Sequence, residues 1–138
     1  MDEQTFKNRT KQFALAVVKL VESLPRTRTA EVLGRQLLRS GTSVGANYRA
    51  ACRGRSASDV VAKLGIVEEE ADEAVYWMEL LVESGVVAND RAQVLMKEAN
   101  EILAMTVASI KTLRNRIRDG LPEFTRSPRS IQNPKSKI

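Results

Sequence analysis

The sequence predicts an all-α fold: an antiparallel, up-down-up-down four-helix bundle over residues 1–120, followed by a flexible tail at residues 121–138. Apolar residues recur at helical spacing in four separate segments, and short connections between such helices favour antiparallel packing. Apolar residues make up 43% of the 138 residues and aromatic residues only 4%, so we expect an aliphatic core. No turn pair typical of a β-hairpin joins two alternating segments, which leaves helix as the predicted element.

The first predicted helix covers residues 3–24 and ends before Pro25, because the residue that precedes a proline is disfavoured in helical geometry. The second covers residues 30–53 and contains three interior glycines. A glycine there costs about 1 kcal/mol relative to alanine, so Gly34, Gly41 and Gly45 predict a closely packed neighbouring backbone. The alternative is a loop or kink near residues 40–42. The expected core positions of both helices are Phe6, Thr10, Phe13, Val17, Leu20, Val21, Leu24, Leu33, Leu37, Val44, Tyr48 and Ala51.

The third predicted helix begins after Ser56, which forms a capping-box pattern with Asp59, and it ends near Gly85. The fourth begins with Asn89 as its N-cap and ends before Gly120. The tail beyond it is polar, basic and proline-containing, so we expect it to be mostly disordered. The expected core positions of the two helices are Val60, Leu64, Val67, Ala71, Ala74, Met78, Leu81, Leu95, Ala99, Ile102, Thr106, Ile110, Leu113 and Ile117.

The residue types exclude several kinds of chemistry. The sequence has no histidine and one cysteine, Cys52, which rules out histidine-based triads, histidine-ligated metals, thiolate zinc sites and an internal disulfide. Neither Ser40, Ser43 nor Cys52 has a plausible base, so we expect no catalytic residue, no cofactor and no metal. The N-terminus lacks an apolar signal core and no stretch of about 18 apolar residues occurs, which predicts a cytoplasmic protein without a membrane partner.

Charge is segregated along the chain, whose net charge is +5. The second predicted helix is rich in arginine and the third is rich in glutamate. An outward-facing group of arginines could neutralise phosphates, and the absence of interleaved aromatics predicts binding through backbone charge with little sequence specificity. The alternative is that the arginines pair with the acidic helices, within or between subunits. The predicted nucleic-acid-binding residues are Arg35, Arg39, Arg49, Arg53 and Arg55.

A second apolar stripe on the third helix predicts self-association. Ile66, Trp77 and Leu80 project away from the core face, with Glu73 between them. Tryptophan is enriched among the residues that dominate binding at interfaces. The alternatives are a wide buried face and partial cover by the tail.

Acidic pairs suggest a less favoured alternative, a magnesium-dependent all-α nucleotide pyrophosphohydrolase. Glu69, Glu70 and Glu73 would supply one set of carboxylates, and Glu98 and Glu101 on the next helix would supply the other. Glu101 stands where that class of enzyme normally has an aspartate.

Three further polar residues, Ser43, Asn47 and Asp59, are expected to be structural. Asn47 lies at the edge of the second helix's core face, where a polar side chain needs partners. We expect Ser43, Tyr48 or a glutamate of the third helix to supply them.

The segment from Leu37 to Gly85, with RSGTSVGANYRAACRGRSASD at residues 39–59 and EEEADE at residues 68–73, closely resembles a known family. These are small bacterial four-helix-bundle proteins first noticed in intervening sequences of large-subunit ribosomal RNA genes. The match is strong over the second and third helices. Many relatives have Ile-Ala-Glu-Gly after the asparagine, where this chain has residues 48–52, YRAAC.

The resemblance implies an antiparallel four-helix bundle that assembles as a ring-like homopentamer. It also implies kinship with the accessory protein of diversity-generating retroelements, a basic bundle that binds nucleic acid and a reverse transcriptase. No catalytic residues come with the family. The motif positions Arg39, Ser43, Asn47, Arg53 and Asp59 are expected to serve packing, subunit contacts or the basic surface. The expected partners are therefore further copies of the chain, RNA or DNA, and an enzyme that acts on nucleic acid. The alternative is an assembly or adaptor protein that binds no nucleic acid.

Overall fold

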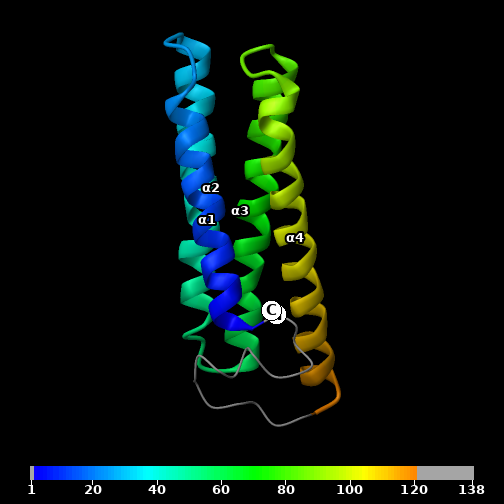
Figure 1. Ribbon diagram of the computed structural model, residues 1–138. Coiled ribbons are helices and arrows are strands. Elements are labelled where there is room, and N and C mark those ends of the chain that lie inside the picture. The colour runs from blue at the N-terminus through cyan, green and yellow to red at the C-terminus, as the bar shows by residue number, and fades with distance from the viewer. Residues whose placement is uncertain (1, 121–138) are drawn as a thin grey trace.

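The structure, a computed structural model, describes residues 2–120 and contains four helices in this part of the chain. They are α1 (Glu3–Glu22), α2 (Arg28–Ala51), α3 (Ala57–Glu83) and α4 (Asn89–Arg118). They run alternately up and down, with the α1–α2 and α3–α4 connections at one end and the α2–α3 connection at the other (Figure 1). The predicted bundle is therefore confirmed. The tail predicted to be disordered, residues 121–138, lies outside the described residues.

Side-chain caps begin three of the helices, as the sequence indicated for α3. Asp2 accepts from the Thr5 N–H at 2.7 Å, and Thr27 caps α2 in the same way. At α3 the Asp59 N–H donates to Ser56 Oγ at 3.1 Å, while the Asp59 carboxylate reaches back to the N–H of Arg55 at 2.9 Å. The capping-box pattern thus forms with one difference. The Asp59 carboxylate accepts from the N–H of Arg55, the residue before the N-cap, in place of the N–H of Ser56 itself.

The start of α4 differs from the prediction that Asn89 is its N-cap. Ala88 occupies that position, with an extended conformation and no side-chain cap, and Asn89 is the first helical residue. The preceding turn explains the shift. Val87 is buried and its N–H donates to the Leu81 carbonyl at 3.0 Å, so the chain is already directed into α4 when it reaches Ala88.

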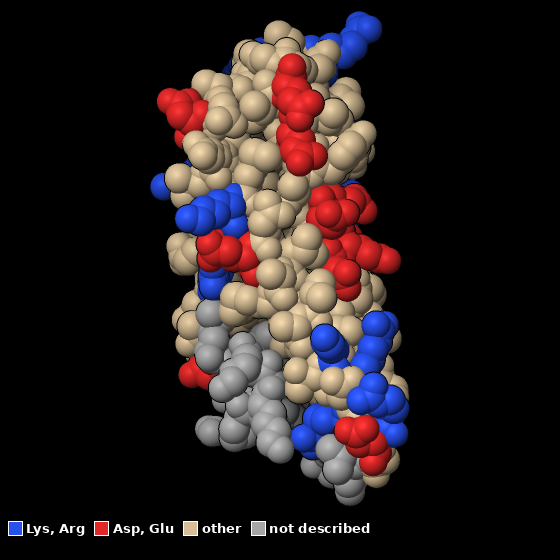
Figure 2. Space-filling view, turned by 90° about the vertical axis from the view of Figure 1, so that its right-hand side faces the viewer, with Lys and Arg blue, Asp and Glu red and all other residues tan. Residues whose placement is uncertain are grey.

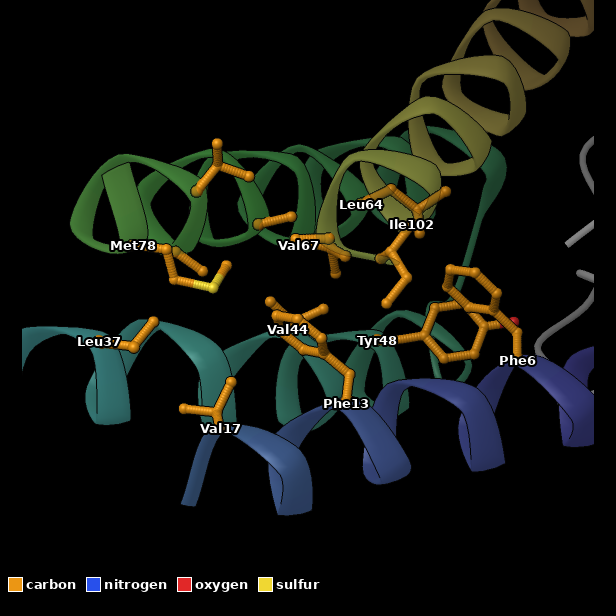
Figure 3. Close-up of a cluster of buried hydrophobic side chains, with 14 of the residues drawn as sticks. Phe6, Phe13, Val17, Leu37, Val44, Tyr48, Leu64, Val67, Met78 and Ile102 are labelled. Carbon is orange, nitrogen blue, oxygen red and sulfur yellow. The ribbon is translucent and has the colours of Figure 1, made fainter. Parts of the chain in front are cut away.

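The core is formed by side chains from all four helices that point toward one another (Figure 3). Phe6 of α1 and Tyr48 of α2 pack edge to face, with ring centroids 4.7 Å apart, near the end where α1 starts. Leu64 of α3 and Ile102 of α4 are completely buried. Each fully buried side chain of this size contributes about 1.5–3 kcal/mol relative to an exposed one, so these stripes supply most of the driving force for folding.

The glycines of α2 face α1, and α2 is continuous through residues 40–42, so the alternative of a loop there is wrong. A Cβ at Gly41 would lie 2.8 Å from Cγ2 of Val17. At Gly45 it would lie 3.1 Å from Thr10 Oγ1 and 3.5 Å from the Thr10 carbonyl carbon. The neighbour that packs close is therefore α1. Side chains of α1 fill most of the space beside the glycines of α2, and the backbone of α1 comes near at Gly45.

The bundle is open on one side. The helix pairs α1–α2, α2–α3 and α3–α4 lie side by side over much of their length, whereas α1 and α4 approach each other over few residues and α1 and α3 are not neighbours. One groove lies on this open side between α1 and α4, and a second groove runs along the surface where α1 packs on α2. Among residues 2–120, no helix combines the length and apolarity needed to cross a bilayer.

Candidate nucleic-acid interface

The predicted arginines lie on the outer side of α2 and in the bend that follows it, in two groups. Arg35 and Arg39 lie in the N-terminal half of the helix, whereas Arg49 lies in its last turn and Arg53 and Arg55 follow it. About 21 Å of helix separates Arg35 from Arg49. All five side chains are exposed. The structure therefore does not bring the five residues together into one site.

Arg39 pairs with the acidic helix, as the alternative interpretation of the arginines expects. Its guanidinium lies 2.8 Å from a Glu73 carboxylate oxygen and 3.5 Å from a Glu70 oxygen on α3. The Arg39 side chain remains 52% exposed, so this pair contributes at most about 1 kcal/mol to stability. Successive residues turn by about 100° around a helix, which directs Arg39 toward α3 and Arg49 toward α1.

Arg49 and Arg53 line a groove between α1 and α2, together with two lysines of α1. This α1–α2 groove has a volume of about 650 Å³. Lys7 and Lys11 form its other side, and none of the described residues that line it is acidic. The lining residues are Gln4, Lys7, Asn8, Thr10, Lys11, Ala14, Thr42, Gly45, Ala46, Arg49 and Arg53. Four cations, two from α1, one from α2 and one from the bend after α2, thus line one shared depression.

The floor of the α1–α2 groove is made of small side chains. Thr10 Oγ1 donates to the carbonyls of Phe6 and Lys7 at 3.0 and 3.1 Å, so this hydroxyl is satisfied within α1. Gly45 leaves room for it on α2. Lys7 Nζ lies 3.0 Å from the carboxylate of Glu3, a buried residue, while Lys11 and Arg49 form no ion pair with any residue from 2 to 120.

Lys7 and Lys11 were not among the residues predicted from the sequence. They are one helical turn apart on α1, but the pattern does not say which stretch of α2 lies beside them. The signal that could have found them is the antiparallel register. Because Thr10 lies against Gly45, the start of α1 must lie beside the end of α2, where Arg49 and Arg53 are.

The carboxylates of the hydrolase alternative are not assembled into a metal site. The Arg9 guanidinium of α1 binds Glu98 at 2.6 and 2.8 Å and Glu101 at 2.6 Å. Glu70 is engaged with Glu73 by Arg39 on the other side of α3. No group of three potential metal ligands occurs within residues 2–120. The two acidic pairs therefore face different neighbours, and the geometry gives that alternative no support.

The residues predicted to form a subunit interface differ in exposure. Ile66 is 42% exposed, but Trp77 and Leu80 are only partly exposed, and Trp77 packs against the core with its Nε1 buried. The neighbouring Tyr76, whose ring centroid is 5.0 Å from that of Trp77, is 52% exposed. The large exposed aromatic of α3 is therefore Tyr76, which the sequence analysis did not select. The assignment of these residues to an interface stays a prediction.

The predicted structural polar residues bond mainly to the backbone. Asn47 Nδ2 donates to the Ser43 carbonyl at 2.8 Å, and Ser43 Oγ donates to the Arg39 carbonyl at 2.6 Å. Asn47 is thus satisfied by its own helix, through the Ser43 main chain, and no bond to α3 is needed.

Cys52 is buried beside Tyr48 and Glu3. Burial, together with the negative charge of Glu3, raises the pKa of the Cys52 thiol to about 11. A buried, protonated thiol is a poor nucleophile, so the cysteine acts as the small packing residue that the sequence analysis expects.

Comparisons with known proteins agree with the resemblance in the sequence. A family model described as 23S rRNA-intervening sequence protein matches residues 2–108. The chain is also similar to the crystal structure of a protein of unknown function from the S23 ribosomal protein family of Bacteroides thetaiotaomicron. That match has a TM-score of 0.72 and 34% identity, and it covers 77% of this chain and 98% of the other. No curated protein matched the chain. Kinship with the accessory protein of diversity-generating retroelements stays a prediction. The chain belongs to the 23S rRNA-intervening sequence protein family.

Proposed function

We propose that this chain is a non-enzymatic, self-associating helical bundle that binds the phosphate backbone of nucleic acid through the α1–α2 groove. The observation that carries the proposal is the meeting of Lys7, Lys11, Arg49 and Arg53 in a groove whose described lining contains no carboxylate. Cations gathered in this way neutralise phosphates and release their counterions, which is the main source of sequence-independent affinity.

The spacing of the cations suits an extended polyanion. Lys7 and Lys11 are one turn apart on α1, which places their charges about 6 Å apart along the groove. Arg49 in the last turn of α2 and Arg53 just beyond its end form the opposite row. The two rows flank a floor of small residues. Arginine adds paired N–H donors that match the oxygens of a phosphate.

The lining also predicts what the groove does not recognise. None of the described lining residues is aromatic, so the bases have no platform for stacking. Gln4, Asn8 and Thr42 offer polar groups that suit sugar and phosphate oxygens. We therefore expect weak, strongly salt-dependent binding with little preference for sequence.

The test is fluorescence anisotropy with a labelled single-stranded RNA and with a labelled duplex of mixed sequence. In Lys11→Glu/Arg49→Glu, two cations without described ion pairs become acidic. Loss of two charge-assisted contacts of about 1.5 kcal/mol each weakens binding by about 100-fold. The matched control is Arg26→Glu/Arg28→Glu, which makes the same change in net charge before α2 and at its start, outside the groove.

The control separates the groove from net charge. We expect it to weaken binding by less than about tenfold, since long-range attraction alone is screened at physiological salt. Equal losses in the two variants would show that overall charge, and no particular groove, attracts the nucleic acid. Absence of binding by the wild-type chain at low salt would refute the proposal.

Self-association is the second part of the proposal, as the pentamer that the family resemblance implies. Support comes from the exposed Ile66 and Tyr76 on α3, which are large apolar residues that the single chain leaves partly uncovered. The name of the Bacteroides relative, which refers to a ribosomal protein family, agrees with an RNA-related role. Multi-angle light scattering tests this part directly. We expect about five times the 15.3 kDa mass of one chain, and a further increase with a short RNA.

An assembly protein without nucleic-acid binding is the second candidate, and the ion pair between Arg39 and Glu73 favours it, because there a basic residue of α2 is used within the fold. Under this hypothesis the light-scattering mass is unaffected by RNA, and the replacement Arg49→Glu disrupts the oligomer. Under the leading proposal the same replacement leaves the oligomer intact and removes RNA binding.

A further inference from the structure

A second groove lies between α1 and α4 on the open side of the bundle, with a volume of about 690 Å³. Its floor and walls are largely apolar and include Phe13, Ala16, Leu20, Val94 and Leu95. Val94 is 78% exposed, which is unusual for a large aliphatic side chain within a helix. Much of the surface in the middle of the α4 side of the molecule carries neither acidic nor basic side chains (Figure 2).

Polar contacts hold this α1–α4 groove at both ends. At one end Arg9 of α1 binds Glu98 and Glu101 of α4. At the other end Arg91 of α4 donates to Ser23 Oγ at 2.6 Å. The two helices are thus fixed relative to each other while the space between them stays open, and the groove is a preformed feature.

The charge that the groove leaves without a partner is positive. Lys19, Arg91 and Lys97 line it, and no ion pair joins any of the three to another residue between positions 2 and 120. Its two acids, Glu98 and Glu101, are already bound by Arg9. An occupant that suits this groove presents an apolar group to the floor and carboxylates to the rim.

The outer face of α3 presents this combination. Tyr76 is 52% exposed at the centre of the face. Residues three, four and seven positions away lie on the same side of a helix. Around Tyr76 two of these residues, Glu73 and Leu80, are half-buried, and the exposed ones are the acids Glu69, Asp72, Glu79 and Glu83. None of these acids has an ion-pair partner among the residues that the structure describes. We call this surface the α3 ridge; it consists of Glu69, Asp72, Tyr76, Glu79 and Glu83.

We propose that the α1–α4 groove of one copy of this chain receives the α3 ridge of a second copy, with Tyr76 of the second copy inserted against Phe13 and Leu20. The ridge carboxylates then lie beside the rim cations Lys19 and Lys97. A buried aromatic anchor surrounded by complementary charge is the usual arrangement of a strong contact point in an interface. The inference rests on the self-association in the proposed function and names the surfaces that produce it.

The contact is head to tail. Because α3 lies beside α2 and α4 and not beside α1, its outer face and the α1–α4 groove are separate surfaces of one chain. Both are available in every copy at once. Such a contact is heterologous, so it joins copies in series and closes into a ring when the rotation between neighbours allows it.

Complementary variants test this arrangement. Tyr76→Ala/Asp72→Lys removes the ridge and keeps the groove, whereas Lys19→Glu/Lys97→Glu removes the groove and keeps the ridge. We expect each variant alone to show the 15.3 kDa mass of a single chain in light scattering. An equimolar mixture should show twice that mass and no larger species, because one intact ridge and one intact groove remain per pair. Circular dichroism checks that both variants keep the helical signal.

The possible outcomes separate this inference from the rest of the proposed function. If the wild-type chain assembles and both variants assemble equally well, the surfaces are wrong although self-association stands. Two single-chain variants that do not combine on mixing would also overturn the inference. If Lys19→Glu/Lys97→Glu loses its helical signal, Val94→Glu replaces it, since Val94 is too exposed to support the core. The control Arg26→Glu/Arg28→Glu should assemble like the wild type. RNA binding is measured separately with Lys11→Glu/Arg49→Glu, so either result can fail alone.

Discussion

Gly41 and Gly65 both lie inside helices, but their surroundings differ completely. An added Cβ at Gly41 would lie 2.8 Å from Cγ2 and 2.9 Å from Cγ1 of Val17, whose branched side chain has little freedom to move. At Gly65 of α3 nothing lies within 4 Å of the corresponding position. The spacing of the glycines in α2 predicts that a neighbouring backbone packs closely there. The spacing does not indicate which helix packs there, since that depends on contacts between residues distant in sequence.

The two glycines therefore give opposite predictions for the same substitution. Gly41→Ala overpacks the α1–α2 contact and lowers the free energy of unfolding by about 1–3 kcal/mol. Gly65→Ala removes the cost of a glycine in an open helical position, so it raises the free energy of unfolding by up to about 1 kcal/mol. Urea unfolding followed by circular dichroism measures both. A stabilised Gly41→Ala would show that α1 stands farther from α2 than the structure places it.

Asp59 gives a prediction for pH. A hydrogen bond from Lys63 Nζ at 2.7 Å and the backbone N–H of Arg55 lower the pKa of Asp59 below its ordinary value of 3.8. A carboxyl whose pKa is lower in the folded state stabilises the fold above pH 3.8, and this contribution disappears as the pH falls through the folded pKa. Asp59→Asn should therefore be less stable than the wild type at pH 7, and the difference should shrink as the pH falls below 3.8. A difference that stays constant from pH 7 to pH 2 would contradict the assignment.

At the scale of the helices, the sequence predicts which face of each element is buried but not how far apart two elements stand. The core stripes of α2 and α3 were predicted because small and aliphatic residues recur there with few interruptions. Tyr76 and Trp77 are adjacent, and the periodic pattern placed Trp77 away from the core. Packing against the core then covered the indole of Trp77 and left Tyr76 exposed. The open α1–α4 side was not predicted, since it depends on the separation of two helices that are far apart in sequence.

Arg9 of α1 joins that helix to α4 through Glu98 and Glu101, so replacing Arg9 should weaken the packing of the two helices. Arg9→Ala leaves Glu98 and Glu101 close together without their cation, and the side chains concerned are only 23–49% exposed. We expect a loss of about 1–2 kcal/mol in unfolding free energy after allowance for solvent screening. Arg39→Ala is the matched control. The Arg39 side chain is 52% exposed and its shorter ion pair is with Glu73, which is 45% exposed, so we expect the replacement to cost less than about 1 kcal/mol. Equal effects would show that Arg9 does not hold α1 to α4.

For the whole molecule, the distribution of charge matters more than its sum of +5. The sequence showed that bases precede acids along the chain. It did not show that Arg39 would be used within the fold or that Lys7 and Lys11 would lie beside Arg49 and Arg53. These outcomes follow from the helical angle of each residue and from the antiparallel register. The predicted arginines were thus identified by residue type, and their grouping required the three-dimensional arrangement.

The strength of the salt dependence tests how many of these cations act together. If about three phosphates are neutralised per chain, a plot of log K against log salt concentration has a slope of about −2.7 for duplex nucleic acid and about −2.1 for a single strand. The variant Lys11→Glu/Arg49→Glu neutralises about two fewer phosphates, so the magnitude of its slope should be smaller by the contribution of about two phosphates. An unchanged slope in that variant would place the contacts elsewhere on the molecule.

The scarcity of contacts between α1 and α4 has a consequence for how quickly the chain reaches its native state. Most contacts in the bundle join helices that follow one another along the polypeptide. Short loops close at little entropic cost, and proteins dominated by such local pairings fold in microseconds to milliseconds. A newly made chain can therefore assemble each helical hairpin as it emerges from the ribosome, without waiting for its last segment to return to its first.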